Sequence, residues 1–397
     1  MYSDDEEVAV FTALAHATFH VYELSIPLFI PVWLDVFSAS TATLGIVVGA
    51  GYALIGVGAL PSGVLSDRFG SKTLVVVAVG GMGGGFLVLA AARGVAGLAA
   101  VLLLWGAAAS IYHPAGLSLI SRVAENRGAV FAYHGVGGSL GTVVGPAATA
   151  VLLAVVDWRL AAVGLAIPAA AVVVSGSLSG VEDARGSDGG VTDLPELVAD
   201  TRALFTAGFA LTLVVVMLYG TYYRGLLTFL PESLSGLAVF DAVVLAGWTV
   251  DPTQYVYAGL LAVGAVGQYA GGRLTDHVRP ELALVGALGT LAVAAVAFVP
   301  ASTVGPAPFL LVCGVLGLVL YAVAPIYQVA IAVRAPEDSH GLSYGYTYLG
   351  MFGVGALGAA MAGTVLTRAG TGALFSTLAL LAALAAAVAV LLVRRRV

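Results

Sequence analysis

The chain has 397 residues, of which 60% are hydrophobic and only 10% are charged, and its net charge is −6. A soluble globular protein carries about 25% charged residues and about 45–50% apolar ones. The composition therefore excludes a soluble enzyme, a disordered chain and a nucleic-acid-binding protein, and it predicts a polytopic helical membrane protein. The single cysteine, Cys313, excludes an internal disulfide and a cysteine-based metal site.

Charged residues and clusters of glycine and proline divide the apolar sequence into twelve predicted membrane spans. Twelve helices of roughly 20 residues need roughly 240 residues, which is close to the observed apolar fraction. A polar stretch separates six spans from six, so we expect a domain over 1–180, a cytoplasmic linker over 181–202 and a second domain over 203–397. The spans are expected at about residues 8–35, 41–62, 73–92, 96–119, 129–154, 159–179, 203–230, 253–271, 281–299, 307–333, 342–366 and 372–393.

The basic residues predict the orientation of the chain. The N-terminus reads Met-Tyr-Ser-Asp-Asp-Glu-Glu, which lacks the basic segment that opens a secretory signal. With both termini in the cytoplasm, twelve basic residues lie in cytoplasmic segments and three lie outside, as the positive-inside rule requires. We therefore expect a multi-pass protein of the cytoplasmic membrane. The twelve are Arg68, Lys72, Arg122, Arg127, Arg185, Arg202, Arg273, Arg279, Arg334, Arg394, Arg395 and Arg396, and the three are Arg93, Arg159 and Arg368.

The two halves repeat one another in the same order. Gly63-Val-Leu-Ser-Asp67-Arg68 recurs as Gly272-Arg-Leu-Thr-Asp276-His277, and Pro114 in the fourth span has a counterpart in the tenth. Two six-helix halves in parallel repeat are the architecture of the major facilitator fold. We therefore expect an all-α membrane protein with twelve transmembrane helices in two pseudo-symmetric six-helix bundles and a substrate path between them.

The segment from Gly63 to Lys72 carries a family resemblance. It matches the loop signature G-x-L-S-D-R-F-G-x-K of the major facilitator superfamily at every defining position. The resemblance extends over the whole chain and implies a transporter whose cytoplasmic gate latches through this loop. It assigns the gate to Gly63, Asp67, Arg68, Gly70 and Lys72, and its second copy, expected to be weaker because of His277 and Pro280, to Gly272, Asp276 and Arg279.

The fifth span contains a second motif. Gly141, Gly145 and Pro146 are similar to the antiporter signature G-x-x-x-G-P of the same superfamily, with Thr149 and Ala150 in place of its trailing glycines. This resemblance favours export over import. Plain helix packing remains the alternative, because small residues four apart let two helices approach closely.

Four spans resemble the fosmidomycin-resistance branch of the superfamily. The fourth span has His113-Pro114 and no arginine, and the glycine-rich fifth span follows it. His16 precedes Pro31 by fifteen residues, and the seventh span contains the similar segment Arg224-Gly-Leu-Leu-Thr-Phe-Leu-Pro231. One departure concerns proton coupling. The branch commonly has an acid four residues after its first-span histidine, but this position holds His20, and the acid Glu23 lies one turn further on.

Ionisable groups inside a bilayer are costly and are therefore candidates for function. His16, His20 and Glu23 lie at i, i+4 and i+7, which places them on one helix face. A carboxylate beside imidazoles can hold and pass a proton near neutral pH, so we expect these three to couple transport to protons. The alternative is a structural hydrogen-bonded cluster. No metal site is expected, since no third histidine or cysteine lies near them in sequence.

Arg224 in the seventh span has two interpretations. Facing the cavity, it would bind an anionic substrate or pair with Glu23; otherwise it would reach the outer interface. Polar and aromatic groups of spans ten and eleven could line the cavity or form interfacial belts, namely Tyr327, Gln328, Tyr344, Tyr346 and Tyr348. The segment 234–251 is expected to lie on the membrane surface or cap the pathway. The expected substrate-cavity residues are His113, His134, Arg224, Tyr112, Tyr223, Tyr327 and Gln328.

These observations predict a monomeric transporter that exports a small organic solute by alternating access against inward proton flow. Its expected partners are the solute, protons and the lipid bilayer, with no nucleic acid. Uptake of an organic anion by symport or exchange is the first alternative. A receptor or scaffold that no longer transports is the second. No enzyme activity and no cofactor are expected, because the loops contain no Ser-His-Asp arrangement, metal box or phosphate loop.

Overall fold

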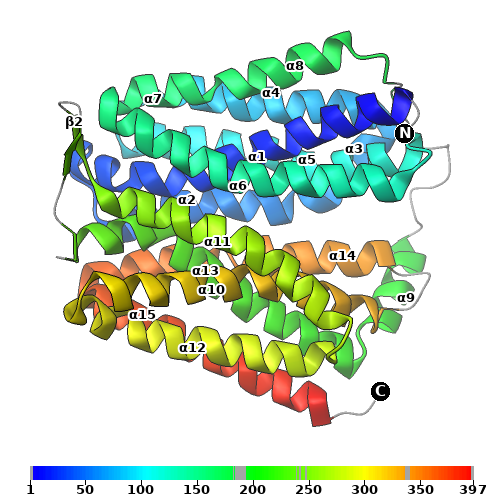
Figure 1. Cartoon of the computed structure of the whole chain (residues 1–397). Coiled ribbons are helices and arrows are strands. Elements are labelled where there is room, and N and C mark those ends of the chain that lie inside the picture. Colours follow the sequence, from blue (N-terminus) through cyan, green and yellow to red (C-terminus); the bar gives the residue numbers. More distant parts are fainter. Residues whose placement is uncertain are drawn as a thin grey trace. The chain divides into compact units, whose positions relative to one another are not determined.

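The computed structural model describes residues 3–181, 183, 194–237, 239–240, 243–245, 248–335 and 340–394. Contacts between Cα atoms divide the chain into two compact units. The first unit contains residues 1–189 and 242–255, and the second contains residues 190–241 and 256–397. Figure 1 labels the elements of both units along the chain.

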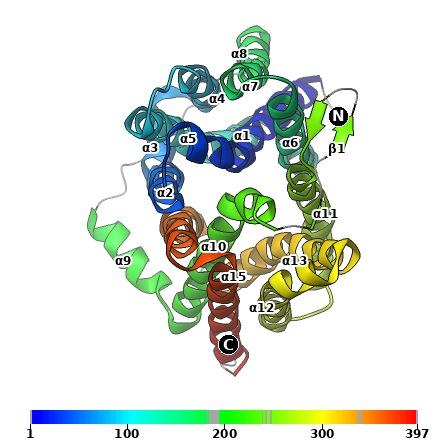
Figure 2. The ribbon, with the colours of Figure 1, turned by 90° about the vertical axis from the view of Figure 1, so that its left-hand side faces the viewer.

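The first unit is a bundle of helices with a short hairpin. Figure 2 shows its helices end-on, with their axes roughly aligned. Pro114 and Pro146 lie inside long helices, which membrane helices tolerate because neighbouring groups satisfy the freed carbonyls. The elements are α1 (Ser3–Val36), α2 (Thr41–Val57), α3 (Ala59–Phe69), α4 (Ser71–Leu89), α5 (Val95–Val123), α6 (Arg127–Val155), α7 (Trp158–Leu165), α8 (Ile167–Leu178) and the antiparallel pair β1 (Val243–Leu245) and β2 (Trp248–Val250).

The second unit is also helical, and one of its turns is a π-helix. A π-turn inside a transmembrane helix is uncommon and often marks a functional position. Here it begins at Leu349, in the predicted eleventh span. The elements are α9 (Leu194–Leu204), α10 (Ala207–Ser235), α11 (Pro252–Thr275), α12 (Pro280–Val304), α13 (Pro306–Ala332), α14 (His340–Tyr348), the π-helix η2 (Leu349–Val354) and α15 (Leu357–Arg394).

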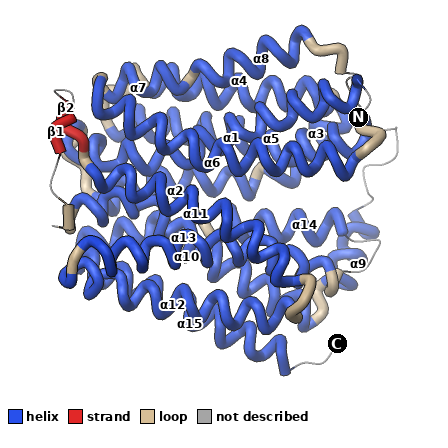
Figure 3. The backbone as a smooth tube through the Cα atoms, viewed as in Figure 1, coloured by secondary structure: helices blue, strands red, loops and turns tan. Residues whose placement is uncertain are grey.

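The helices account for the twelve predicted spans. Within the described residues, nine helices are long and apolar enough to cross a membrane, and one of these runs from Leu342 to Arg394. That long helix contains Gly370 at φ 78° and ψ −176°, where the chain bends between the predicted eleventh and twelfth spans. Dividing it there and adding α2 and α11 gives all twelve segments, six in each half. Figure 3 shows how completely helix dominates the described chain.

Glycine allows the paired helices of each unit to touch backbone to backbone. A Cβ at Gly141 would overlap the carbonyl of Ala17 in α1, and one at Gly106 would overlap the carbonyl of Gly51 in α2. In the second unit, a Cβ at Gly358 would overlap the carbonyl of Thr221 in α10. Such close approach is the usual device of membrane bundles, where lipid is as apolar as the side chains. Spans one and five, and equally spans seven and eleven, are therefore packed as pairs.

The structure corrects two details of the sequence prediction, at the gate signature and in the second span. The segment from Gly63 to Phe69, expected as a loop, is the second half of α3, and only Gly70 leaves the helical conformation. The predicted second span is broken at Gly58, which ends α2. The expected linker includes α9 from Leu194, although most of its earlier part lies outside the described residues. The segment 234–251 contains the hairpin of β1 and β2.

Candidate functional site

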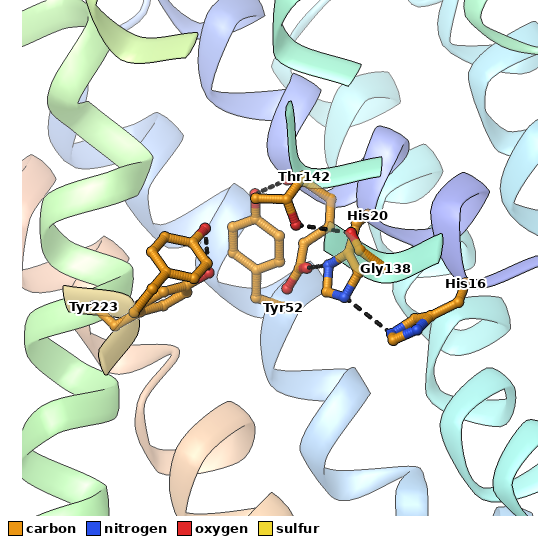
Figure 4. Close-up of polar contacts among 8 residues, drawn as sticks. His16, His20, Tyr52, Gly138, Thr142 and Tyr223 are labelled. Atoms are coloured by element: carbon orange, nitrogen blue, oxygen red, sulfur yellow. Dashed lines mark hydrogen bonds and ion pairs between the residues drawn. The ribbon is translucent and has the colours of Figure 1, made fainter. Parts of the chain in front are cut away.

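Three ionisable side chains of α1 form a continuous line of polar contacts, which we call the α1 cluster: His16, His20 and Glu23. Nδ1 of His20 lies 2.8 Å from Oε2 of Glu23, and Nε2 of His20 lies 3.1 Å from Nε2 of His16. Figure 4 shows the contact between His16 and His20 as a dashed line. The side chain of Glu23 is 2% exposed and that of His20 is 23% exposed, so His20 is the more accessible end of this ion pair.

His16 connects the α1 cluster to α6. Its Nδ1 lies 2.8 Å from the backbone oxygen of His134. A carbonyl oxygen can only accept, so Nδ1 of His16 carries a hydrogen and donates it. The ring of His134 also stacks on the ring of His16 with centroids 4.0 Å apart. The contact thus fixes the tautomer of His16, leaving its Nε2 to face His20.

Two further groups from α5 complete the surroundings. The ring of His113 meets the edge of His16 at 5.3 Å between centroids, and Tyr112 stacks on His16 at 5.9 Å. The hydroxyl of Tyr112 donates to the backbone oxygen of Thr12 on α1. His113, His134 and Tyr112, which we had expected in the substrate cavity, therefore lie beside the expected proton-coupling residues.

Three of the histidines have the spacing of a metal site. Ligand nitrogens of His16, His20 and His113 all lie within 4.8 Å of one another. Sequence spacing did not indicate the third member, because His113 comes from α5 and is distant in the chain. The expectation that no metal binds here stays a prediction, and any proton measurement on this cluster needs a chelator as a control.

Glycines of α6 create the space for the α1 cluster. A Cβ at Gly138 would overlap the ring of His16, and a Cβ at Gly145 would meet the backbone of Val21. Further along, Thr149, which stands where the antiporter signature has glycine, donates from its hydroxyl to Oγ of Ser25 at 2.6 Å. The motif with Gly141, Gly145 and Pro146 therefore lies along α1, and Thr149 adds a hydrogen bond to that packing.

Arg224 is buried in the second unit. It is 1% exposed, and its guanidinium lies 5.6 Å from the ring centroid of Tyr223 and 5.4 Å from that of Phe352. Phe352 belongs to the π-helix η2, and Gly220, one turn before Arg224 on α10, faces Met351 of the same turn. The side chain thus lies among aromatic rings rather than in an exposed position. Sequence reasoning missed Phe352, since a π-turn has no clear sequence signal.

Tyrosines surround this region of α10. Tyr219 donates to the backbone oxygen of Leu320 at 2.6 Å, and the hydroxyls of Tyr223 and Tyr321 lie 3.2 Å apart. Tyr327 is buried with its ring 5.9 Å from that of Tyr219. Tyr219, Tyr223 and Tyr327 are buried, whereas Tyr344 is 40% exposed. The choice between a cavity lining and an interfacial belt for the tyrosines of spans ten and eleven stays a prediction. Gln328, on the neighbouring position of α13, is exposed.

The gate signature is joined to the start of the linker. Gly70, with φ 96°, ends α3 and has no side chain to cap α4. The carboxylate of Asp183 replaces that cap, since it accepts from the backbone N–H of Lys72 at 2.9 Å and from Oγ1 of Thr73. Nζ of Lys72 donates to the backbone oxygens of Ser179 and Val181.

The remaining residues of the signature are Arg68, Asp67 and Gly63. Arg68 is exposed, with its guanidinium 5.4 Å from the ring of Phe69. The side chain of Asp67 lies outside the described residues, so its expected latch stays a prediction. At Gly63 a Cβ would meet none of the described atoms within 4 Å.

Sequence reasoning missed Glu281, an acid that directly follows the second copy of the signature. Arg334 forms a buried ion pair with Glu281, and the exposed Arg279 lies 3.5 Å from the same carboxylate. Gly272 packs near Pro325, whereas Asp276 is exposed. Glu281 follows Pro280 directly in the chain.

The comparisons with known proteins agree with this architecture. None of the curated proteins matches the chain. Among solved structures, a bacterial homologue of the human lysosomal transporter Spinster, inward-facing and occupied, is 15% identical with a TM-score of 0.77 and covers 98% of this chain and 96% of its own. A peptide transporter POT in complex with sulfate is 13% identical, with a TM-score of 0.76 over 98% of this chain and 94% of its own.

A mutant of the nucleoside transporter NupG is also similar, with 13% identity and a TM-score of 0.73 over 99% of both chains. At these identities the likeness establishes the fold, which is that of transporters. The model of the Major Facilitator Superfamily matches residues 11–359, most of the chain. The predicted all-α polytopic fold is confirmed, and the chain belongs to the major facilitator superfamily.

Proposed function

We propose that this protein is a proton-coupled antiporter that exports a small organic solute by alternating access. The observation that carries the proposal is the unbroken contact line of the α1 cluster inside a membrane helix. A buried carboxylate that hydrogen-bonds an imidazole can exchange a proton without leaving an isolated charge in the bilayer. Glu23, His20 and His16 are the proposed coupling residues.

The proposed orientation places both termini in the cytoplasm of a cell whose cytoplasmic membrane holds the protein. The excess of arginine in the segments that would face inward supports it. The end of α3 with Lys72 and Asp183 then lies on the cytoplasmic side. There the signature would act as the gate that opens and closes during alternating access, with the Glu281–Arg334 pair in the matching position of the second half.

The proposed substrate carries a negative charge and an apolar or planar body. Arg224 supplies a permanently charged, planar donor group, and the rings of Tyr223 and Phe352 border it. This combination also supports the second candidate, uptake of an organic anion together with protons. Membership of the fosmidomycin-resistance branch remains a proposal from the resemblance of spans one, four, five and seven.

The direction of coupling distinguishes the two candidates. The full chain is placed in proteoliposomes with a trapped pH indicator, and fosmidomycin, other organic anions and the cation ethidium are added outside in turn. Antiport predicts accumulation when the vesicle interior is acidic, since outward proton flow drives solute inward. Symport predicts accumulation when the exterior is acidic. Uptake that is equal with and without a pH gradient contradicts proton coupling, and no uptake above protein-free vesicles for any solute contradicts transport.

A further inference from the structure

The contact between the Nε2 atoms of His16 and His20 requires a hydrogen on one of the two nitrogens. Nδ1 of His16 is a donor because its partner is the carbonyl of His134, so Nε2 of a neutral His16 has only a lone pair. Nε2 of His20 lies 3.1 Å from that lone pair. Two lone pairs do not approach to this distance, and therefore Nε2 of His20 must carry a hydrogen for the contact to hold.

The contact between Nδ1 of His20 and the carboxyl group of Glu23 also requires a hydrogen on one of the two groups. Nδ1 of His20 faces a carboxylate oxygen of Glu23 at 2.8 Å, and an ionised carboxylate only accepts. Either His20 carries both hydrogens and is charged beside ionised Glu23, or Glu23 is protonated and donates to neutral His20. The two forms differ only in the position of one hydrogen. Both contain one proton more than ionised Glu23 with neutral His20.

We propose that the coupling proton is bound in this line of contacts, one per protein, and that its presence holds His20 against His16; the inference rests on the proposed proton-coupled transport. On uptake, water delivers a proton, one new N–H or O–H bond forms within the His20–Glu23 pair, and no covalent bond of the protein breaks. On release the proton returns to water, and His20 must give up its contact with either His16 or Glu23.

Gly138 and the carbonyl of His134 are the positioning groups of this site. The missing side chain of Gly138 lets the ring of His16 lie against α6, where the carbonyl of His134 takes its Nδ1 hydrogen. A methyl group at Gly138 would push the ring away, and the tautomer of His16 would no longer be fixed. Gly135, one turn earlier on α6, is the matched control because a Cβ there meets no described atom within 4 Å.

The neighbouring groups disfavour a second proton. His134 stacks on His16 at 4.0 Å, and His113 lies 5.3 Å from His16 and 6.1 Å from His20 between ring centroids. Among the described residues, Tyr112 of α5 stacks on His16, and Tyr52 of α2 donates from its hydroxyl to the backbone oxygen of Glu23. A second imidazolium at these separations would repel the first in a medium of low dielectric constant. We therefore expect His113 and His134 to stay neutral.

The test is nitrogen NMR of the full chain in lipid nanodiscs with ¹⁵N-labelled histidine and EDTA present. The expected result is that the signals of His16 and His20 shift together at one midpoint as the pH falls, while those of His113 and His134 do not move. The Gly138→Ala variant should separate the two responses, and Gly135→Ala should leave them joined. Independent midpoints for His16 and His20 in the wild type, or no effect of Gly138→Ala, would overturn the inference.

A second variant covers the case in which Gly138→Ala does not fold. His16→Phe keeps a ring in the same space but removes both nitrogens. His20 should then titrate at a midpoint displaced from that of the wild type, whereas an unchanged midpoint contradicts a bond between the two histidines. Joint titration without any proton-driven transport would refute the proposed function while leaving this proton site intact, so the two failures are distinguishable.

Discussion

The imidazole of His20 contacts the carboxylate of Glu23 at 2.8 Å, one turn apart on α1. The fosmidomycin-resistance branch, which four spans resemble, commonly has an acid at the position of His20. In this chain Glu23 contacts that histidine from one turn further along α1. The rings of Tyr112, His113 and His134, from α5 and α6, lie beside His16 of the same cluster.

Packing between α1 and α6 should depend on the glycines of the antiporter-like motif. Gly141→Leu forces a side chain into the carbonyl of Ala17, and overpacking of this kind costs about 1–3 kcal/mol. We expect a lower thermal unfolding temperature for the purified chain in detergent. Gly135→Leu, on the same helix at a position with no described atom in the way, is the control and should unfold near the wild-type temperature. Equal effects of both variants would contradict this packing.

The ion pair of Arg334 and Glu281 should contribute far more to the free energy of unfolding than the pair of Arg279 with the same carboxylate. The side chain of Arg334 is 4% exposed and that of Arg279 is 55% exposed. Arg334→Ala leaves a buried carboxylate without its main partner, at a cost of about 3–5 kcal/mol. Arg279→Ala should cost no more than about 1 kcal/mol. Chemical unfolding of the two variants compares them directly, and a larger loss for Arg279→Ala would refute the assignment.

Asp183 should protect the first turn of α4. The Asp183→Ala variant removes the cap that accepts from the N–H of Lys72, which is worth about 1 kcal/mol. Amide hydrogen exchange at residues 72–74 should become about fivefold faster, as such a loss implies. Asp200→Ala, an exposed acid on α9, serves as the control. Unchanged exchange in Asp183→Ala would show that the linker does not cap this helix.

Arg224 should select solutes by charge. Arg224→Gln removes the positive charge, and Arg224→Lys keeps the charge but loses the planar guanidinium that fits anions and aromatic rings. A charged hydrogen bond contributes about 1.5–3 kcal/mol, so we expect a loss of at least about tenfold in affinity for transported anions with Gln and a smaller loss with Lys. Competition by each anion for transport measures this. Equal affinity for anions in both variants and the wild type would exclude Arg224 from substrate binding.

Sequence periodicity predicted the twelve membrane segments because each is a long apolar run between charged or glycine-rich breaks. It did not predict the break at Gly58 or the helical form of the gate signature. Ser66, Asp67 and Arg68 are acceptable in a helix turn as well as in a loop, so their residue types do not distinguish the two. Spacing on α1 identified His16, His20 and Glu23 as residues of one face. It could not bring in the carbonyl of His134, because backbone contacts between helices leave no mark on residue type.

The same limit applies to the second unit. Arg224 and Tyr223 stand out in the sequence as polar groups in an apolar span. Phe352, by contrast, is an ordinary aromatic residue until the π-turn η2 carries it to the guanidinium. Glu281 and Arg334 lie 53 positions apart, and only folding shows that they form a pair.

The most direct test of the account is the Glu23→Gln variant in proteoliposomes with an acidic interior, compared with Glu6→Gln, an exposed acid on the same helix. The probe is the solute that the wild type accumulates in the screen. We predict that Glu23→Gln still exchanges labelled for unlabelled solute. It should neither accumulate the solute nor change the internal pH that the trapped indicator reports, while Glu6→Gln behaves as wild type. Gradient-driven accumulation by Glu23→Gln at the wild-type level would contradict the account.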